Sequence, residues 1–94
     1  MNKKEEFKLT EGSRYKILSI SGRDNALETI GVFKGFATIG IEEGGLLIEL
    51  DENHGDNQGI LRIVPLHAIL AIDILNAKEE DKKDELKDTH QFYG

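Results

Sequence analysis

The most apolar part of the chain consists of two short segments, Ile60–Val64 and Ile69–Leu75, separated by Pro65. Both segments are rich in Ile, Val and Leu, which is typical of β-strands. Proline fixes its own φ and cannot donate to a β-ladder. We therefore expect the first strand to end before Pro65 and the chain to turn tightly through Ala68 into the second strand.

Both of these predicted strands are apolar on both faces, because apolar residues occupy odd and even positions alike. Such a strand lies either in the middle of a sheet or against another chain. A chain of 94 residues has room for few central strands. The pattern therefore predicts a partner subunit, with an interface formed by Ile60, Ile63, Val64, Ile69, Leu70, Ile72 and Ile74.

Three further segments carry strand signals: Arg14–Ser21, Glu28–Gly40 and Leu46–Leu50. The second is interrupted by Gly31 and Gly35, and glycines inside a strand mark sharp bends or close backbone approach. No amphipathic segment of helix length separates the strands. The sequence therefore predicts an all-β fold, a five-stranded and strongly bent small barrel.

The segments on either side of the predicted barrel differ from it in composition. Residues 1–13 mix Lys and Glu with Phe7 and Leu9, which predicts either a short N-terminal helix or a loose arm. Residues 77–94 are charge-dense and predict a frayed helix or a disordered tail. The polar run Asp51–Gly59 is expected to be a loop. The domain organisation is thus one barrel over 14–76 with an arm and a charged tail.

Charge and composition narrow the possible functions. The net charge is −6 and no segment has a basic excess, which argues against general DNA binding but leaves room for a small RNA pocket. The absence of cysteine excludes a disulfide framework and a catalytic thiol, and fits a reducing compartment. The longest apolar stretch, Ile63–Ile72, is too short to cross a bilayer and no secretory signal is seen, so we expect a cytoplasmic protein with no membrane partner.

The sequence lacks the common catalytic and metal-binding motifs. The sequence has no P-loop, dinucleotide fingerprint or G-x-S-x-G motif, so we expect no enzyme, no catalytic residue and no cofactor. The acidic run that contains Asp51, Glu52, His54 and Asp56 has neither EF-hand nor zinc-site spacing, and we expect no metal there. The aromatic residues Tyr15, Phe33 and Phe36 could stack nucleic-acid bases, but their apolar neighbours favour positions in the core.

Two motifs resemble those of the Sm and Sm-like (LSm) family. The run Gly31–Phe36 (GVFKGF), followed by Leu46–Leu50, resembles the Gly-x-Leu-x-Gly-Phe signature of that family. The run Val64–Ile72 (VPLHAILAI) is similar to its second signature, with His67-Ala68-Ile69 resembling the Lys-His-Ala-Ile segment of Hfq proteins. The resemblance covers about residues 14–76. It implies an SH3-like or Sm-like barrel and a homo-oligomeric ring of six or seven subunits, in which the fourth strand of one subunit pairs with the fifth of the next.

The resemblance also implies single-stranded RNA on one face of the ring, at the turns between strands two and three and between strands four and five. The matching candidates are His67, Arg62, Glu42, Glu43 and Gly44. The sequence departs from the family here, since Ala37 replaces the Asp of Asp-x-x-x-Asn and Pro65-Leu66 replaces Arg-Gly.

Each candidate has a structural alternative. His67 could be a turn histidine bonded to backbone, and Glu42 and Glu43 could form a solvated turn. Arg62 could contact phosphate, although an ion pair with Glu49 is favoured. Two functions remain open: an RNA-binding Sm-like ring, or an oligomeric protein-interaction scaffold that kept the fold and lost the RNA site. A ligand-sensing or metal-sensing subunit is the third and least favoured interpretation.

Overall fold

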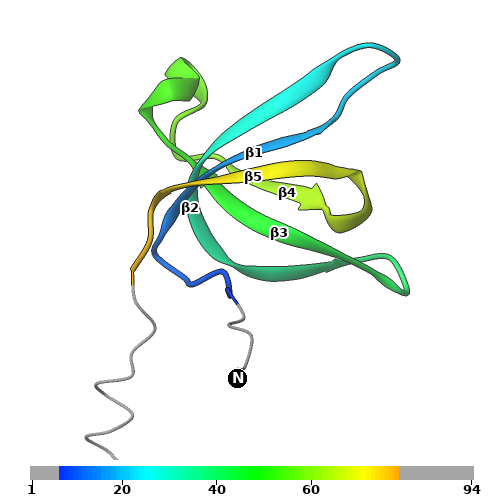
Figure 1. Ribbon diagram of the computed structural model, residues 1–94, viewed down its shortest axis with the longest axis horizontal. Helices are drawn as coiled ribbons and strands as arrows, with labels where there is room; N and C mark the ends of the chain where they lie inside the picture. Colours follow the sequence, from blue (N-terminus) through cyan, green and yellow to red (C-terminus); the bar gives the residue numbers. More distant parts are fainter. Residues whose placement is uncertain (1–6, 79–94) are drawn as a thin grey trace, which may run out of the picture.

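The computed structural model describes residues 7–78, and these form one five-stranded antiparallel sheet (Figure 1). The strand order is β4-β3-β2-β1-β5. The prediction of an all-β, five-stranded fold is confirmed, and the strand ends differ from the predicted ones by at most three residues, at the start of β3. The elements are β1 (Arg14–Ile20), β2 (Ala26–Ile39), β3 (Glu43–Leu50), the 3₁₀-helix η1 (Glu52–Asn57), β4 (Leu61–Pro65), the 3₁₀-helix η2 (Leu66–Ala68) and β5 (Ile69–Asn76).

Strand β2 organises the sheet because it pairs with β1 along its first half and with β3 along its second half. The predicted bends at Gly31 and Gly35 are both present. A Cβ at Gly31 would lie 2.1 Å from the carbonyl oxygen of Glu49 on β3, which is possible only for glycine. Gly35 has a φ of +130° and follows a shift in register opposite β3. These features let one 14-residue strand curve around the core.

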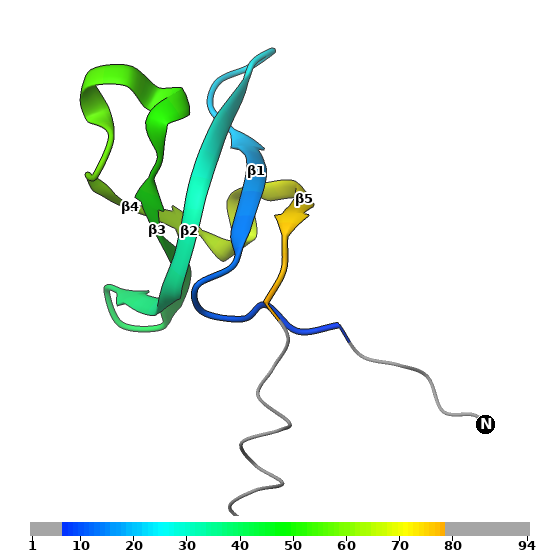
Figure 2. The ribbon, with the colours of Figure 1, turned by 90° about the vertical axis from the view of Figure 1, so that its left-hand side faces the viewer.

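The two edge strands of the sheet, β4 and β5, are consecutive in sequence. Only η2 separates them, so the sheet must curl to bring its opposite edges near each other (Figure 2). Within the described residues β4 pairs with β3 alone and β5 with β1 alone. The fold is therefore barrel-like, but its sheet is not closed.

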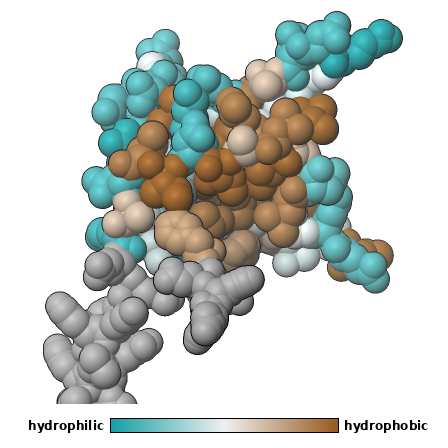
Figure 3. Space-filling model, viewed as in Figure 1, coloured by the Kyte–Doolittle hydropathy of each residue, from teal (hydrophilic) through white to brown (hydrophobic). Residues whose placement is uncertain are grey.

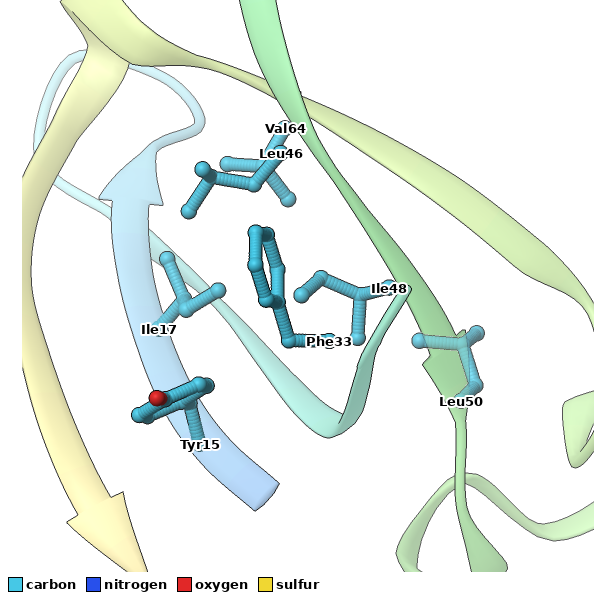
Figure 4. Packing of buried hydrophobic residues seen from close by; sticks show 7 residues of the cluster. All are labelled: Tyr15, Ile17, Phe33, Leu46, Ile48, Leu50 and Val64. Carbon is cyan, nitrogen blue, oxygen red and sulfur yellow. The ribbon is translucent and has the colours of Figure 1, made fainter. Parts of the chain in front are cut away.

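The core lies inside this curled sheet, with Phe33 among side chains from four strands (Figure 4). The rings of Tyr15 and Phe33 meet edge to face, with centroids 6.1 Å apart. The buried apolar residues are Tyr15, Ile17, Phe33, Leu46, Ile48, Leu50 and Val64. The predicted core positions of Tyr15 and Phe33 are confirmed.

The prediction that Phe36 is a core residue is wrong, since 67% of its surface is exposed. The alternation of buried and exposed positions continues along β2, with Phe33 and Gly35 buried and Lys34 and Phe36 exposed, so Phe36 lies at an outward position. Its ring still approaches that of Phe33, with centroids 5.3 Å apart. The open sheet does not cover Phe36 on its far side. The residue therefore borders the core without being enclosed by it.

The segments outside the strands also differ from expectation. The predicted polar loop contains η1, whose first turn is capped by Asp51. Residues 7–13 contain no helix; this segment places Leu9 against the core and ends in a turn. Its end is tied to the residues after β5, because the Lys78 N–H donates to Ser13 Oγ at 2.7 Å. The predictions for residues 1–6 and 79–94 lie outside the described part of the chain.

Candidate functional site

The open edges of β4 and β5 are the most distinctive surface feature of the sheet. Each of these strands has a ladder partner on one side only among residues 7–78. Unpaired strand edges are ready templates for pairing with another chain. Apolar side chains accompany both edges, and the large ones exposed along or beside them are Ile60, Leu61, Ile63, Leu66, Leu70, Ile74 and Leu75.

The apolar surface is continuous rather than scattered. Figure 3 shows apolar side chains gathered in the middle of one face, in the region that β4 and β5 occupy in Figure 1, while hydrophilic residues cover its margins. A large exposed apolar patch with a polar rim is typical of an interaction surface. We refer to the two edges and their exposed side chains as the edge surface.

Most residues expected at a subunit interface lie on this edge surface. Ile60, Ile63, Leu70 and Ile74 are exposed there, whereas Ile69 and Ile72 are partly buried and pack against the core. Val64 is different, because only 2% of its surface is exposed. Its side chain belongs to the core and its backbone is paired with Leu46 of β3, so Val64 is not part of the edge surface.

Sequence reasoning missed Leu61, Leu66 and Leu75 as exposed residues of the edge surface. Strand β5 has two irregularities in its pairing with β1, and each disturbs the alternation of inward and outward residues. Leu61 and Leu75 already belonged to strands that are apolar on both faces. Apolar residues on both faces indicated that one face would stay exposed, but they did not show which face would pack against the core.

The two turns named as candidate RNA contacts come together in the structure. His67 in η2 lies beside Glu43 at the start of β3, with Nδ1 and Oε2 3.0 Å apart. A Cβ added at Gly44 would lie 3.3 Å from Leu66 Cδ1. The backbone at Gly44 is therefore packed closely against the Leu66 side chain of η2. Glu42 lies in the same turn and is exposed. The partner of His67 is therefore a carboxylate rather than backbone.

Arg62 does not join this turn cluster. Its guanidinium donates to Thr29 Oγ1 at 2.8 Å and to the carbonyl oxygen of Glu28 at 3.2 Å. The favoured ion pair between Arg62 and Glu49 is wrong, because Glu49 lies 3.5 Å from the ammonium group of Lys34. The structure thus separates Arg62 from the other four RNA candidates.

Three of the seven positive side chains in the described part are paired with carboxylates. Arg14 pairs with Asp51, Lys16 with Glu28 and Lys34 with Glu49. Residues 7–78 carry 7 Lys and Arg against 10 Asp and Glu, a difference of −3. A nucleic-acid groove needs cations available to phosphates. The charge distribution therefore does not favour broad phosphate binding.

The pair between Arg14 and Asp51 is the best-defined ionic contact. Burial alone would raise the pKa of Asp51, but hydrogen bonds from the Asn53 backbone and side chain and from Arg14 outweigh it and lower the pKa. The same hydrogen bond to Asp51 raises the pKa of Arg14. This contact fastens the end of β3 to β1 and has a structural role.

The remaining candidate chemistry has no organised site in the part described. Residues 7–78 contain no group of three or more His, Asp or Glu side chains placed to hold a metal ion. In the acidic run, Asp51 pairs with Arg14 and His54 accepts a hydrogen bond from the Ile30 N–H. No helix within the described range is long and apolar enough to span a membrane.

Comparison of the chain with protein-family models, with curated proteins and with solved structures gives no significant match.

Proposed function

We propose that this protein is a self-associating subunit in which the β4 edge of one copy pairs with the β5 edge of the next. The assembly would serve as a protein-interaction scaffold. The observation that carries the proposal is the presence of exposed apolar side chains along both open edges of one sheet. Pairing would satisfy the unpaired backbone groups and remove Leu61, Leu70 and their neighbours from water.

Contact between two different edges is head-to-tail, and it generates either a closed ring or an open filament. The resemblance of Gly31–Phe36 and Val64–Ile72 to Sm-like signatures supports a ring of six or seven subunits. Self-association would also stabilise a chain of this size, which has a modest core and no cysteine to form a disulfide.

The mass of the purified full chain at micromolar concentration tests this proposal, measured by size-exclusion chromatography with light scattering. We expect six or seven times the 10.5 kDa of one chain. A closed ring would keep the same mass on dilution through the micromolar range, whereas a filament would show a broad and concentration-dependent mass. A strictly monomeric species would overturn the proposal.

Binding of single-stranded RNA is the second candidate function, and one observation favours it. The turn before β3 and the turn after β4, at which the family resemblance implies RNA contacts, meet at His67 and Glu43. Two features argue against RNA binding. The Glu43 carboxylate already contacts the His67 imidazole, and acidic side chains at this turn repel phosphates.

A fluorescence titration with short oligo-U and oligo-A, at low and near-physiological salt, separates the two candidates. Binding that persists at the higher salt and is lost in His67→Ala would support the RNA function. Absence of binding to both oligonucleotides at low salt would rule out this candidate and leave the scaffold.

A further inference from the structure

Among residues 7–78, no strand pairs with the edge of β2 between Glu28 and Ile30 on the side of β3. Pairing between β2 and β3 begins at Gly31 opposite Leu50, after which the chain leaves the sheet and enters η1. Side chains and one backbone group take the place of the missing strand. The Asp51 N–H donates to the Ile30 carbonyl oxygen at 3.1 Å, and Arg62 donates to the carbonyl oxygen of Glu28.

The remaining contact at this edge is made by a histidine of η1. The Ile30 N–H donates to His54 Nε2 at 2.9 Å, and His54 is partly buried. This bond joins the 3₁₀-helix that connects β3 with β4 to the middle of β2. A histidine nitrogen can accept such a bond only while it carries no proton.

We propose that His54 is a pH-sensitive latch, which fastens η1 to β2 when its imidazole is neutral and releases η1 when the imidazole is protonated. Protonation at Nε2 would place two donors opposite each other, so the bond to Ile30 would be lost. An imidazole in water becomes predominantly charged below about pH 6.5. The latch lies within one chain and does not depend on self-association.

Other charged groups lie beside or within η1 and on the strands of the sheet. Most of these groups are acidic, which would favour the charged imidazole once it is released. They are Asp51, Glu52 and Asp56 beside or within η1, Glu28 on β2, Arg62 on β4 and Arg14 on β1.

Release would leave the Ile30 N–H without its acceptor at this edge of β2. The segment that contains η1 would still be held at its start by Asp51 and at its end by the Gly59 N–H, which donates to the Leu50 carbonyl oxygen at 2.8 Å. Because η1 leads directly into β4, acid would also loosen the approach to one of the two open edges. The device therefore offers a means of changing the exposed edges of the fold by pH.

Residue-resolved amide hydrogen exchange on the full chain tests the latch. Because the bond to Ile30 needs an imidazole without a proton on Nε2, the protection factor of the Ile30 amide should fall roughly tenfold between about pH 7.5 and pH 5.5. The Phe33 amide serves as an internal reference, because it donates to the Ser13 carbonyl oxygen and has no contact with His54. An unchanged Ile30 protection factor would overturn the proposal.

Two variants separate the latch from a general effect of acid. In His54→Gln the side-chain oxygen can accept the same bond without titrating, so the pH dependence at Ile30 should disappear. His67→Ala removes the exposed histidine of η2 and should keep the roughly tenfold change. The same loss of protection in His54→Gln as in the wild-type chain would contradict the latch.

A measurement on the wild-type chain covers the case in which His54→Gln does not fold. Nitrogen shifts of the His54 ring should report the tautomer with the proton on Nδ1 at about pH 7.5, leaving Nε2 free to accept. A proton on Nε2 at that pH would overturn the proposal.

Discussion

At Gly31 a single hydrogen atom in place of a side chain permits the closest backbone approach described for this sheet. A Cβ there would lie 2.1 Å from the Glu49 carbonyl oxygen and 2.9 Å from a methyl group of Ile48. The carbonyl oxygen is part of the β3 backbone and cannot turn aside as the end of a flexible side chain can. The approach lets β2 pass from its β1 partner to its β3 partner without a break.

Gly31→Ala should lower the free energy of unfolding by roughly 3 kcal/mol, because β2 and β3 must separate to admit the methyl group. Urea denaturation followed by circular dichroism measures this difference. Gly22→Ala is the matched control, since a Cβ there would meet nothing within 4 Å and the residue lies in the turn before β2. The control should change stability by less than about 0.5 kcal/mol. Equal stabilities of the two variants would contradict the steric argument.

Among the elements, η1 depends most on one side chain that precedes it. Asp51 accepts the Asn53 N–H at 2.9 Å, which caps the first turn of η1, and its other oxygen pairs with Arg14 on β1. The ion pair needs the ionised carboxylate, and ionisation also strengthens the capping hydrogen bond. The element that the sequence presented as a polar loop is therefore ordered by an ion pair and a cap.

The lowered pKa of Asp51 predicts acid sensitivity with a defined sign. A carboxylate whose folded pKa lies below its unfolded value contributes stability above the unfolded pKa and loses it as pH falls through the folded pKa. Stability should therefore decline below about pH 4. In Asp51→Asn this part of the decline should be absent, while stability at neutral pH should be about 1–2 kcal/mol lower.

Urea unfolding at a series of pH values between neutral and strongly acidic measures both effects. Asp24→Asn, in the exposed turn between β1 and β2, is the control and should retain the wild-type acid dependence. An Asp51→Asn variant with the same loss of stability in acid as the wild-type chain would show that Asp51 is not the group responsible.

On the scale of the whole molecule, the open sheet and its two apolar edges are the feature on which the proposed self-association rests. Barrels remove their edges by closing, but here β4 and β5 remain unpaired on one side within residues 7–78. The core contacts of Ile69 and Ile72 hold β5 in place. The residues beside them on the edge surface are free to meet a second copy.

Leu70→Asp should dissociate the proposed assembly, because it places a charge inside the paired edge at a position whose side chain is 60% exposed in the single chain. The fold should persist, since Leu70 contributes little to the core. Light scattering would then report the mass of one chain, with an unchanged circular dichroism spectrum.

Ile41→Asp is the matched control for this variant. Ile41 is 91% exposed in the turn between β2 and β3 and belongs to neither edge strand, and its replacement should leave the assembly intact. An assembly that survives Leu70→Asp with its mass unchanged would exclude the β5 edge as the contact.

The sequence by itself determined the number, kind and approximate bounds of the strands. These are local properties: runs of β-branched residues, the turn at Pro65, and the glycines Gly31 and Gly35 that permit bends. It also indicated that the last two strands would have an apolar face that the chain itself does not cover. That inference needed only the observation that both of their faces are apolar.

Only the tertiary structure decided which side chains are exposed and which charges meet. Phe36 occupies an outward position of β2, Val64 is the buried residue of β4, and the irregular pairing of β5 with β1 disturbs the alternation along β5. The meeting of His67 with Glu43 and of Arg62 with Thr29 joins residues that are distant in sequence. Such contacts depend on strand order and register, which arise from the packing of the whole sheet rather than from any local run of residues.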